Sequence, residues 1–570
     1  MKKIILNILF LTIGISLYAQ DNWNEPTEGE LEDSQIVIEK NRSLDLPRAT
    51  RSFRQVPKID QSSDSIRVNF SWNEITPELS KLKPGLRVLR IKDEPIPKLF
   101  ANQVSAGFGN YGASYLSGFV GNKRDRNKSY GVQFYHKSFN KGAVDEKYSG
   151  SGYQMVRPSA RFFNDKISFE TSLLYDRTNN YAYGSIEEEL DLNESFSRDE
   201  FQKKFQTAGA HIGLSDRNIE DYFTYDYDAD FYHLFTSMNT AETNFNFSLN
   251  NTYNFRGAFG AKLNASGFIS NYNYFNESQS YNRNLIQIDP SVVYKLDQII
   301  LEGGLNISYD NQSRTNISEV YVYPNLNATY FPLAKTYLGI GISGDVRQVT
   351  YKSVLETNPY LDPSFILENT INPFQLTLKA GSNLLDKVQI DGSFEVGTVN
   401  KLPYFTDVRT DNQSGNELLQ SFVSIYSDNL TELKSSILIQ TDFGKNFNLS
   451  AKGQYLSYAN DSIDALPYVP KFKLDLKGNV SIKEKVEIGL SVYLQSKMEA
   501  YYRRIDFSSN LATMTEIDPF ADLGLDVRYN LTSRASIFVN ANNLLSNKYE
   551  YYLNYPNRGF QILGGFTYSF

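Results

Sequence analysis

Apolar and polar residues alternate with a period of two through much of this chain from residue 99 onward. Within Thr243 to Asn250, Phe245, Phe247 and Leu249 alternate with residues that are all Asn or Ser. The stretches Phe472 to Ile482 and Val486 to Gln495 alternate in the same way. Successive side chains of a strand point to opposite faces, so each stretch predicts a strand with one apolar and one polar face.

The length of these runs favours strands that cross a membrane. Strands of soluble sandwiches are typically about 5 to 6 residues long and need an apolar partner sheet. A tilted strand needs about 9 to 11 residues to cross a bilayer. The fold class predicted is therefore all-β, a transmembrane antiparallel β-barrel with its apolar face toward outer-membrane lipid and its polar face toward the lumen.

Connection lengths give an independent test, because such barrels alternate short periplasmic turns with longer outer loops. Short links are predicted at 162–166, 295–298, 331–335, 384–387, 443–446, 482–485 and 531–534. Long polar stretches fall between them, at 178–204, 348–373, 401–429 and 497–518. With the amino end in the periplasm and 401–429 counted as one outer loop, the pattern predicts about 22 strands.

The amino terminus has the layout of a secretory signal peptide. Lys2 and Lys3 precede an apolar run from Ile4 to Leu17, and Ala19 follows. We expect residues 1–19 to be removed; a retained anchor is the alternative, although spanning a bilayer takes about 20 apolar residues. Because an exported β-barrel of this kind inserts into the outer membrane, we predict that the protein lies in the outer membrane of a Gram-negative bacterium.

Composition excludes several function classes. The chain has no Cys, so it forms no disulfide, and a net charge of -8 argues against a nucleic-acid partner. His136, His211 and His233 are the only histidines, and none lies in a nucleophile motif or at metal-ligand spacing. We therefore predict no catalytic residue, no metal site, no cofactor and no enzyme.

Two segments imitate ligand motifs. Gly107 to Gly112 reads G-x-G-x-x-G, but strands precede and follow it, so a tight turn is expected there. Asp226 to Asp230 reads DYDAD, the start of a calcium loop, yet Phe231 and Ser237 stand where that loop needs Gly and an acidic residue. Alternating aspartates on a strand share one face, so we expect them toward the lumen or rim.

The last strand ends on aromatic residues spaced two apart, Phe566, Tyr568 and Phe570. We expect all three to face lipid. A terminal Phe preceded by such aromatics resembles the targeting signal that the barrel-assembly machinery recognises, which makes that machinery an expected partner. The alternative is that any final lipid-facing strand has this composition.

Residues 536–570 resemble the last two strands of TonB-dependent receptors. The resemblance is carried by the run from 556 to 560 before the last strand and by six residues upstream, Val539, Asn542, Asn543, Leu544, Lys548 and Tyr549. The run LFANQVSAGFGNYGASYL, residues 99–116, is similar to a plug-poor subgroup from Bacteroidetes-like bacteria. The resemblance implies a 22-stranded barrel and a place in solute uptake.

The amino-terminal segment departs from that family, whose members carry a large plug domain ahead of the first strand. Only residues 20–98 precede the barrel at 99–570, and they are crowded with prolines. We interpret them as a periplasmic arm and not a full plug. Within the arm, Ile36, Val37 and Ile38 are a possible partner-strand segment for an energy-coupling protein; a short local strand or a linker is the alternative.

A barrel of this width without a plug would leave an aqueous hole. Three alternatives could fill the lumen: the arm, outer loops folded inward such as residues 184–204, or a separate protein. The leading hypothesis is solute or nutrient passage across the outer membrane, with a partner that occludes the lumen and a surface lipoprotein or energy-coupling protein attached. The alternative is a scaffold subunit of an assembly or secretion complex that transports nothing.

Overall fold

The computed structural model divides into two units, Met1–Asp93 and Glu94–Phe570. It describes residues 100–570 except 124, 145–147, 186–200, 219–221, 256, 274–279, 363–364, 411–420, 445, 461–464 and 507–508, all within the second unit. The expected signal peptide, the arm at 20–98 and the segment Ile36, Val37 and Ile38 lie outside the described residues. The domain boundaries at residues 19 and 98 stay predictions.

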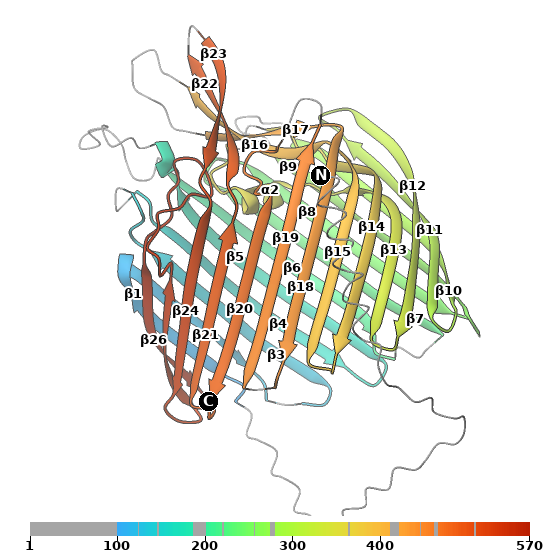
Figure 1. Ribbon diagram of the computed structural model, residues 1–570, viewed down its shortest axis with the longest axis horizontal. Coiled ribbons are helices and arrows are strands. Elements are labelled where there is room, and N and C mark those ends of the chain that lie inside the picture. Colours follow the sequence, from blue (N-terminus) through green and yellow to red (C-terminus); the bar gives the residue numbers. More distant parts are fainter. Residues whose placement is uncertain are drawn as a thin grey trace, which may run out of the picture. The chain divides into compact units, whose positions relative to one another are not determined.

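Twenty-two antiparallel strands form one closed sheet, which confirms the predicted fold class and strand number (Figure 1). The wall consists of β1 (Gln103–Gly109), β2 (Ala113–Gly121), β3 (Lys128–Phe139), β4 (Ser151–Phe163), β5 (Ile167–Tyr181), β6 (Gln202–Asp216), β7 (Phe223–Thr236), β8 (Ala241–Asn254), β9 (Phe259–Asn273), β10 (Ser280–Lys295), β11 (Ile299–Gln312), β12 (Ile317–Leu333), β13 (Thr336–Arg347), β14 (Thr370–Leu384), β15 (Val388–Asn400), β18 (Leu430–Asp442), β19 (Phe447–Ala459), β20 (Phe472–Ile482), β21 (Val486–Gln495), β24 (Phe520–Asn530), β25 (Ala535–Asn542) and β26 (Gln561–Ser569).

Strands β1 and β26 close the ring. Their register pairs Ser105 with Thr567, and the two side-chain oxygens lie 2.8 Å apart and buried. The Phe570 N–H donates to the Asn102 carbonyl at 2.9 Å. Gly109 permits a close approach here, because an added Cβ would lie 2.2 Å from the Ile562 carbonyl oxygen. Closure leaves no unpaired edge strand in the wall.

The outer face of the wall is apolar. Large aliphatic side chains from strands around the ring are about half exposed on it, including Leu173, Ile212, Ile269, Ile340, Ile437 and Leu490. Their neighbours in sequence point into the barrel and are mostly small or polar, as in a barrel that crosses a membrane. Among the described residues, no helix is both long enough and apolar enough to span a bilayer.

The predicted short links are all turns between neighbouring wall strands, and β20 and β21 have the predicted bounds. Other strands run farther toward the long-loop end than predicted: β5 continues to Tyr181 and β14 begins at Thr370. The physical reason is that a strand needs apolar residues only where lipid touches it. Beyond that belt the backbone ladder continues while the alternation that marks it fades.

Two of the predicted long loops contain strands of their own. β16 (Leu402–Thr410), β17 (Ser421–Ser427), β22 (Met498–Asp506) and β23 (Ser509–Ile517) form a four-stranded sheet in which β16 and β22 pair in parallel. The hairpin of β22 and β23 extends away from the wall at the long-loop end (Figure 1). The 3₁₀ turns η1 (Asn110–Gly112) and η2 (Tyr183–Ser185) and the helix α2 (Tyr351–Thr357) complete the elements.

Candidate functional site at the barrel mouth

The expected surface aromatics lie as predicted. Phe566, Tyr568 and Phe570 are 46%, 42% and 45% exposed, on the apolar outer face of β26 and just beyond it. Their part in recognition by the barrel-assembly machinery stays a prediction. The G-x-G-x-x-G stretch is the predicted tight turn, since η1 joins β1 to β2, with positive φ at Tyr111 and Gly112.

The three histidines are dispersed over the wall. On the outer face, His136 lies 3.0 Å from the Ser114 hydroxyl, and His233 lies 2.9 Å from that of Thr243. His211 faces the lumen, where its Nδ1 lies 2.9 Å from Asp230. The DYDAD aspartates line that same luminal face of β7, as predicted. In the described part of the chain, no group of three or more His, Asp or Glu side chains is arranged to hold a metal ion.

The mouth of the barrel is occupied by the connection between β13 and β14, residues 348–369, which we call the cap segment. It carries α2 and lies within the ring of wall strands at the long-loop end (Figure 1). Thr350 caps the helix: its side chain accepts the Ser353 N–H, and the Ser353 hydroxyl pairs with the Thr350 backbone. One of the three fillers considered, an outer loop folded inward, is therefore present. Most of residues 184–204, the loop named for it, lies outside the described residues.

A buried carboxylate of the wall holds the start of α2. Glu242 on β8 is fully buried, and its two oxygens accept the backbone N–H groups of Tyr351 at 3.0 Å and Lys352 at 3.1 Å. The Tyr232 hydroxyl donates to the same carboxylate at 3.0 Å. The first N–H groups of a helix lack partners within the helix and carry partial positive charge, so a carboxylate stabilises them.

Two wall cations hold the rest of the cap segment. Arg283 on β10, 1% exposed, donates to the Val349 carbonyl and to the Asn369 side chain, each at 2.6 Å. The Lys203 ammonium on β6 donates to the carbonyls of Tyr360 at 2.7 Å and of Leu361 at 3.2 Å. Both ends and the middle of the segment are thus tied to three different strands. Each contact involves a charged group, which makes it stronger than a neutral hydrogen bond.

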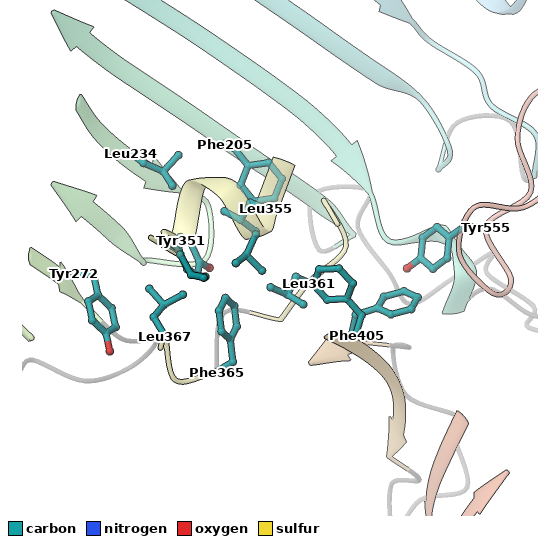
Figure 2. Close-up of a cluster of buried hydrophobic side chains, with 13 residues drawn as sticks. Phe205, Leu234, Tyr272, Tyr351, Leu355, Leu361, Phe365, Leu367, Phe405 and Tyr555 are labelled. Carbon is teal, nitrogen blue, oxygen red and sulfur yellow. The ribbon is translucent and has the colours of Figure 1, made fainter. Parts of the chain in front are cut away.

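Aromatic packing closes the space around the cap segment. Figure 2 shows Tyr351, Leu355, Leu361, Phe365 and Leu367 of the segment among side chains of the wall and of neighbouring loops. The partners include Phe205 and Leu234 from wall strands, Phe405 from β16 and Tyr555 from the loop at 543–560. Burial of the apolar surface of this cluster favours the closed arrangement.

A cavity of about 340 Å³, the mouth cavity, lies between the cap segment and the loop at 543–560. Its lining is Tyr183, Thr357, Pro359, Tyr360, Tyr551, Tyr552, Tyr555 and Asn557. Burial raises the pKa of Tyr360, Tyr552 and Tyr555, so their hydroxyls are neutral at ordinary pH. The Tyr552 hydroxyl donates to the Thr357 carbonyl, which joins the two loops across the cavity. Such a lining offers flat apolar faces and neutral donors to a ligand.

Sequence reasoning missed both the cap segment and this cavity. The alternation pattern predicts only a polar outer loop for the stretch 348–373. A local signal was present: Thr350 and Ser353 match a helix start, and Val354, Leu355, Leu361, Phe365 and Leu367 are too apolar for a solvated loop.

A closed barrel with a half-exposed apolar belt and a polar interior defines the class: this is a transmembrane β-barrel of the bacterial outer membrane. No family model matches the chain, and no curated protein matches its sequence. Solved structures do match, and those named below have the 22-stranded barrel of TonB-dependent siderophore receptors. They are receptors and transporters, not enzymes, which agrees with the prediction that the chain has no enzymatic activity.

The ferric-catecholate import receptor Fiu from Escherichia coli K12 matches with a TM-score of 0.59 at 11% identity, over 84% of this chain and 82% of that one. The FrpB iron transporter from Neisseria meningitidis has a TM-score of 0.61 at 10% identity, over 83% and 82%. The FpvAI–pyocin S2 complex has a TM-score of 0.60 at 12% identity, over 84% and 74%. At such identities the likeness shows the fold.

Proposed function

We propose that this barrel takes up a scarce nutrient across the outer membrane, with the cap segment as a barrier that must move for the solute to pass. The observation that carries the proposal is the cap itself: hydrogen bonds and aromatic packing hold it in the mouth, above a polar lumen. A receptor needs such a barrier, because an open barrel of this width would leak solutes. The likeness to receptors of iron compounds supports iron chelates as the first solutes to test.

The route implied by this proposal begins in the mouth cavity. Its aromatic lining suits a solute with a flat or apolar body. Tyr551 and Asn557 also line a second cavity on the inner face of the wall, so the two cavities adjoin. Displacing the Tyr552 contact with Thr357 would separate the two loops that lie between the outside and the lumen.

The partners proposed for uptake act at the two ends of the barrel. We propose that residues 20–98 form a periplasmic arm and not a full plug, that a separate protein occludes the lumen, and that energy is coupled through Ile36, Val37 and Ile38. A surface lipoprotein would cover the mouth. The FpvAI–pyocin S2 complex is one case of a protein partner on a similar barrel. No feature of the described residues favours the scaffold alternative.

The test uses a strain that lacks this protein. The strain is complemented either with the wild-type protein or with a variant in which a short Gly-Ser linker replaces residues 350–368. Growth and uptake of radioactive iron from a panel of iron chelates are measured under iron limitation. The proposal predicts that deletion abolishes uptake of at least one solute and that wild type restores it. An envelope defect independent of nutrients, with uptake unchanged throughout the panel, would contradict uptake and favour the scaffold.

A further inference from the structure

Two cations flank one aromatic ring on the inner face of the wall. The Arg558 guanidinium, in the loop before β26, lies 4.0 Å from the centre of the Phe139 ring. The Lys137 ammonium, two residues earlier on β3, lies 5.5 Å from the same centre. Sharing one ring places two like charges close together, and their mutual repulsion raises the energy of this arrangement unless an anion offsets it.

Neither cation forms an ion pair with a carboxylate among the residues that the structure describes, although Asp526, outside the lining of the cavity described below, attracts Lys137 electrostatically. Arg558 donates one hydrogen bond, from Nη2 to the Ser151 hydroxyl at 2.9 Å, and its Nε is buried without a hydrogen-bond partner. Burial lowers the pKa of the Arg558 guanidinium, because the charged form loses contact with water there. A buried or half-buried cation is normally paired, so this arrangement departs from the usual pattern.

Both cations line the second cavity named above, the luminal cavity, of about 520 Å³. Tyr135, Tyr153, Tyr549 and Tyr551 contribute flat walls to it. Asp522 is the only carboxylate in its described lining, and both of its oxygens are already engaged, by the Tyr549 hydroxyl and by the Asn543 N–H at 3.0 Å. The described lining of the cavity therefore has one net positive charge.

We infer that the luminal cavity is a binding site for an organic oxyanion, a carboxylate or phosphate carried on a flat apolar body. The guanidinium and the ammonium would take the oxyanion as charge-assisted hydrogen-bond donors, and the tyrosines would pack against the body. Its volume is in the range of small-molecule sites. The inference deepens the proposed function, on which it rests, by naming the chemical class of solute that passes from the mouth cavity.

Binding to the purified full chain in detergent tests this site without requiring transport. The probes are benzoate and phenyl phosphate. Benzyl alcohol is the uncharged aromatic control, and inorganic phosphate is the anionic control that lacks an aromatic group. Binding of each compound is measured by calorimetry. We expect both aromatic anions to bind and benzyl alcohol to bind at least about tenfold more weakly, the size of one charge-assisted hydrogen bond. Stronger binding of phenyl phosphate would assign a phosphate ligand, and stronger binding of benzoate a carboxylate.

Lys137→Met and Arg558→Met should each weaken anion binding about tenfold or more, while Lys137→Arg retains it. Lys477→Met is the matched control, because Lys477 lines a different luminal cavity. Equal binding of benzyl alcohol and benzoate would overturn the site, as would an unchanged affinity in Lys137→Met or an equal loss in Lys477→Met. Folding of each variant is checked by heat-modifiable mobility on gels; Lys137→Met keeps the test decisive if Arg558→Met fails to fold.

Failure of this site and failure of uptake are distinguishable. Anion binding to the purified chain without uptake of any solute by cells would contradict the proposed function and leave the site standing. Uptake that is restored equally by wild type and by Lys137→Met, with no preference for anions in calorimetry, would overturn the site and leave the proposed function standing.

Discussion

The carboxylate of Glu242, on the barrel wall, accepts the backbone N–H of Tyr351, the first residue of α2, at 3.0 Å. The two residues are 109 positions apart in sequence, and one of them lies on a strand while the other begins a seven-residue helix. So short a helix is marginal alone, since helices below about 12 residues rarely persist in water. The wall therefore stabilises the cap helix as well as positioning it.

Glu242→Gln should loosen the cap segment. The amide keeps one acceptor but turns a donor toward the second N–H group, and leaving a buried donor unpaired costs about 1 to 3 kcal/mol. We expect brief conductance steps in planar bilayers to become about tenfold or more frequent than in wild type. Glu395→Gln is the control, because Glu395 is a luminal acid that accepts from Gln375 at 2.6 Å on neighbouring strands below the cap. Equal behaviour of the two variants would contradict a holding role for Glu242.

Ser105→Cys combined with Thr567→Cys should form a disulfide under mild oxidation. The native side-chain oxygens are 2.8 Å apart across the seam, and the chain has no other Cys to compete. Cross-linking joins the first and last strands and is detected by altered mobility after denaturation. Ser105→Cys with Ser569→Cys is the control, since Ser569 pairs with Gln103 and is displaced along the seam. Equal cross-linking in both pairs would mean that the register is wrong.

Phe570→Ala should lower the amount of folded barrel in the outer membrane severalfold. The variant keeps the backbone hydrogen bonds between Phe570 and Asn102, so it tests the side chain as an assembly signal and leaves the seam intact. Phe443→Ala removes a comparably exposed aromatic, 48% against 45%, from a turn between β18 and β19. If both substitutions lower the folded amount equally, the terminal Phe has no special role in assembly.

The wall of this barrel was predictable and the cap was not, and the reason is the range of the interactions. Period-two alternation is local, and over β20 and β21 it defines both strands to the residue. The contacts that hold the cap span 66 positions from Arg283 to Val349 and 157 from Lys203 to Tyr360. In the sequence, Arg283 and Lys203 cannot be distinguished from other lumen-facing polar residues of the wall. The pattern of the strand shows that Glu242 faces inward but not what it meets there.

The outer sheet was missed for a related reason. β16 and β22 pair in parallel, with partners 95 positions apart, and each lies directly after a wall strand inside a stretch that the sequence predicts to be a long outer loop. Parallel pairing between two separate outer loops has no local signature. The terminal aromatics, in contrast, needed only the period of their own strand.

The claim that the cap segment closes this barrel is tested most directly by ion conductance in planar bilayers. The full chain is compared with the variant in which a Gly-Ser linker replaces residues 350–368. A second variant, with residues 502–513 of the β22–β23 hairpin shortened, controls for the loss of outer loop. We expect little steady conductance for the full chain and for the hairpin variant, and large steady steps for the cap variant. Equal conductance of the full chain and the cap variant would contradict it.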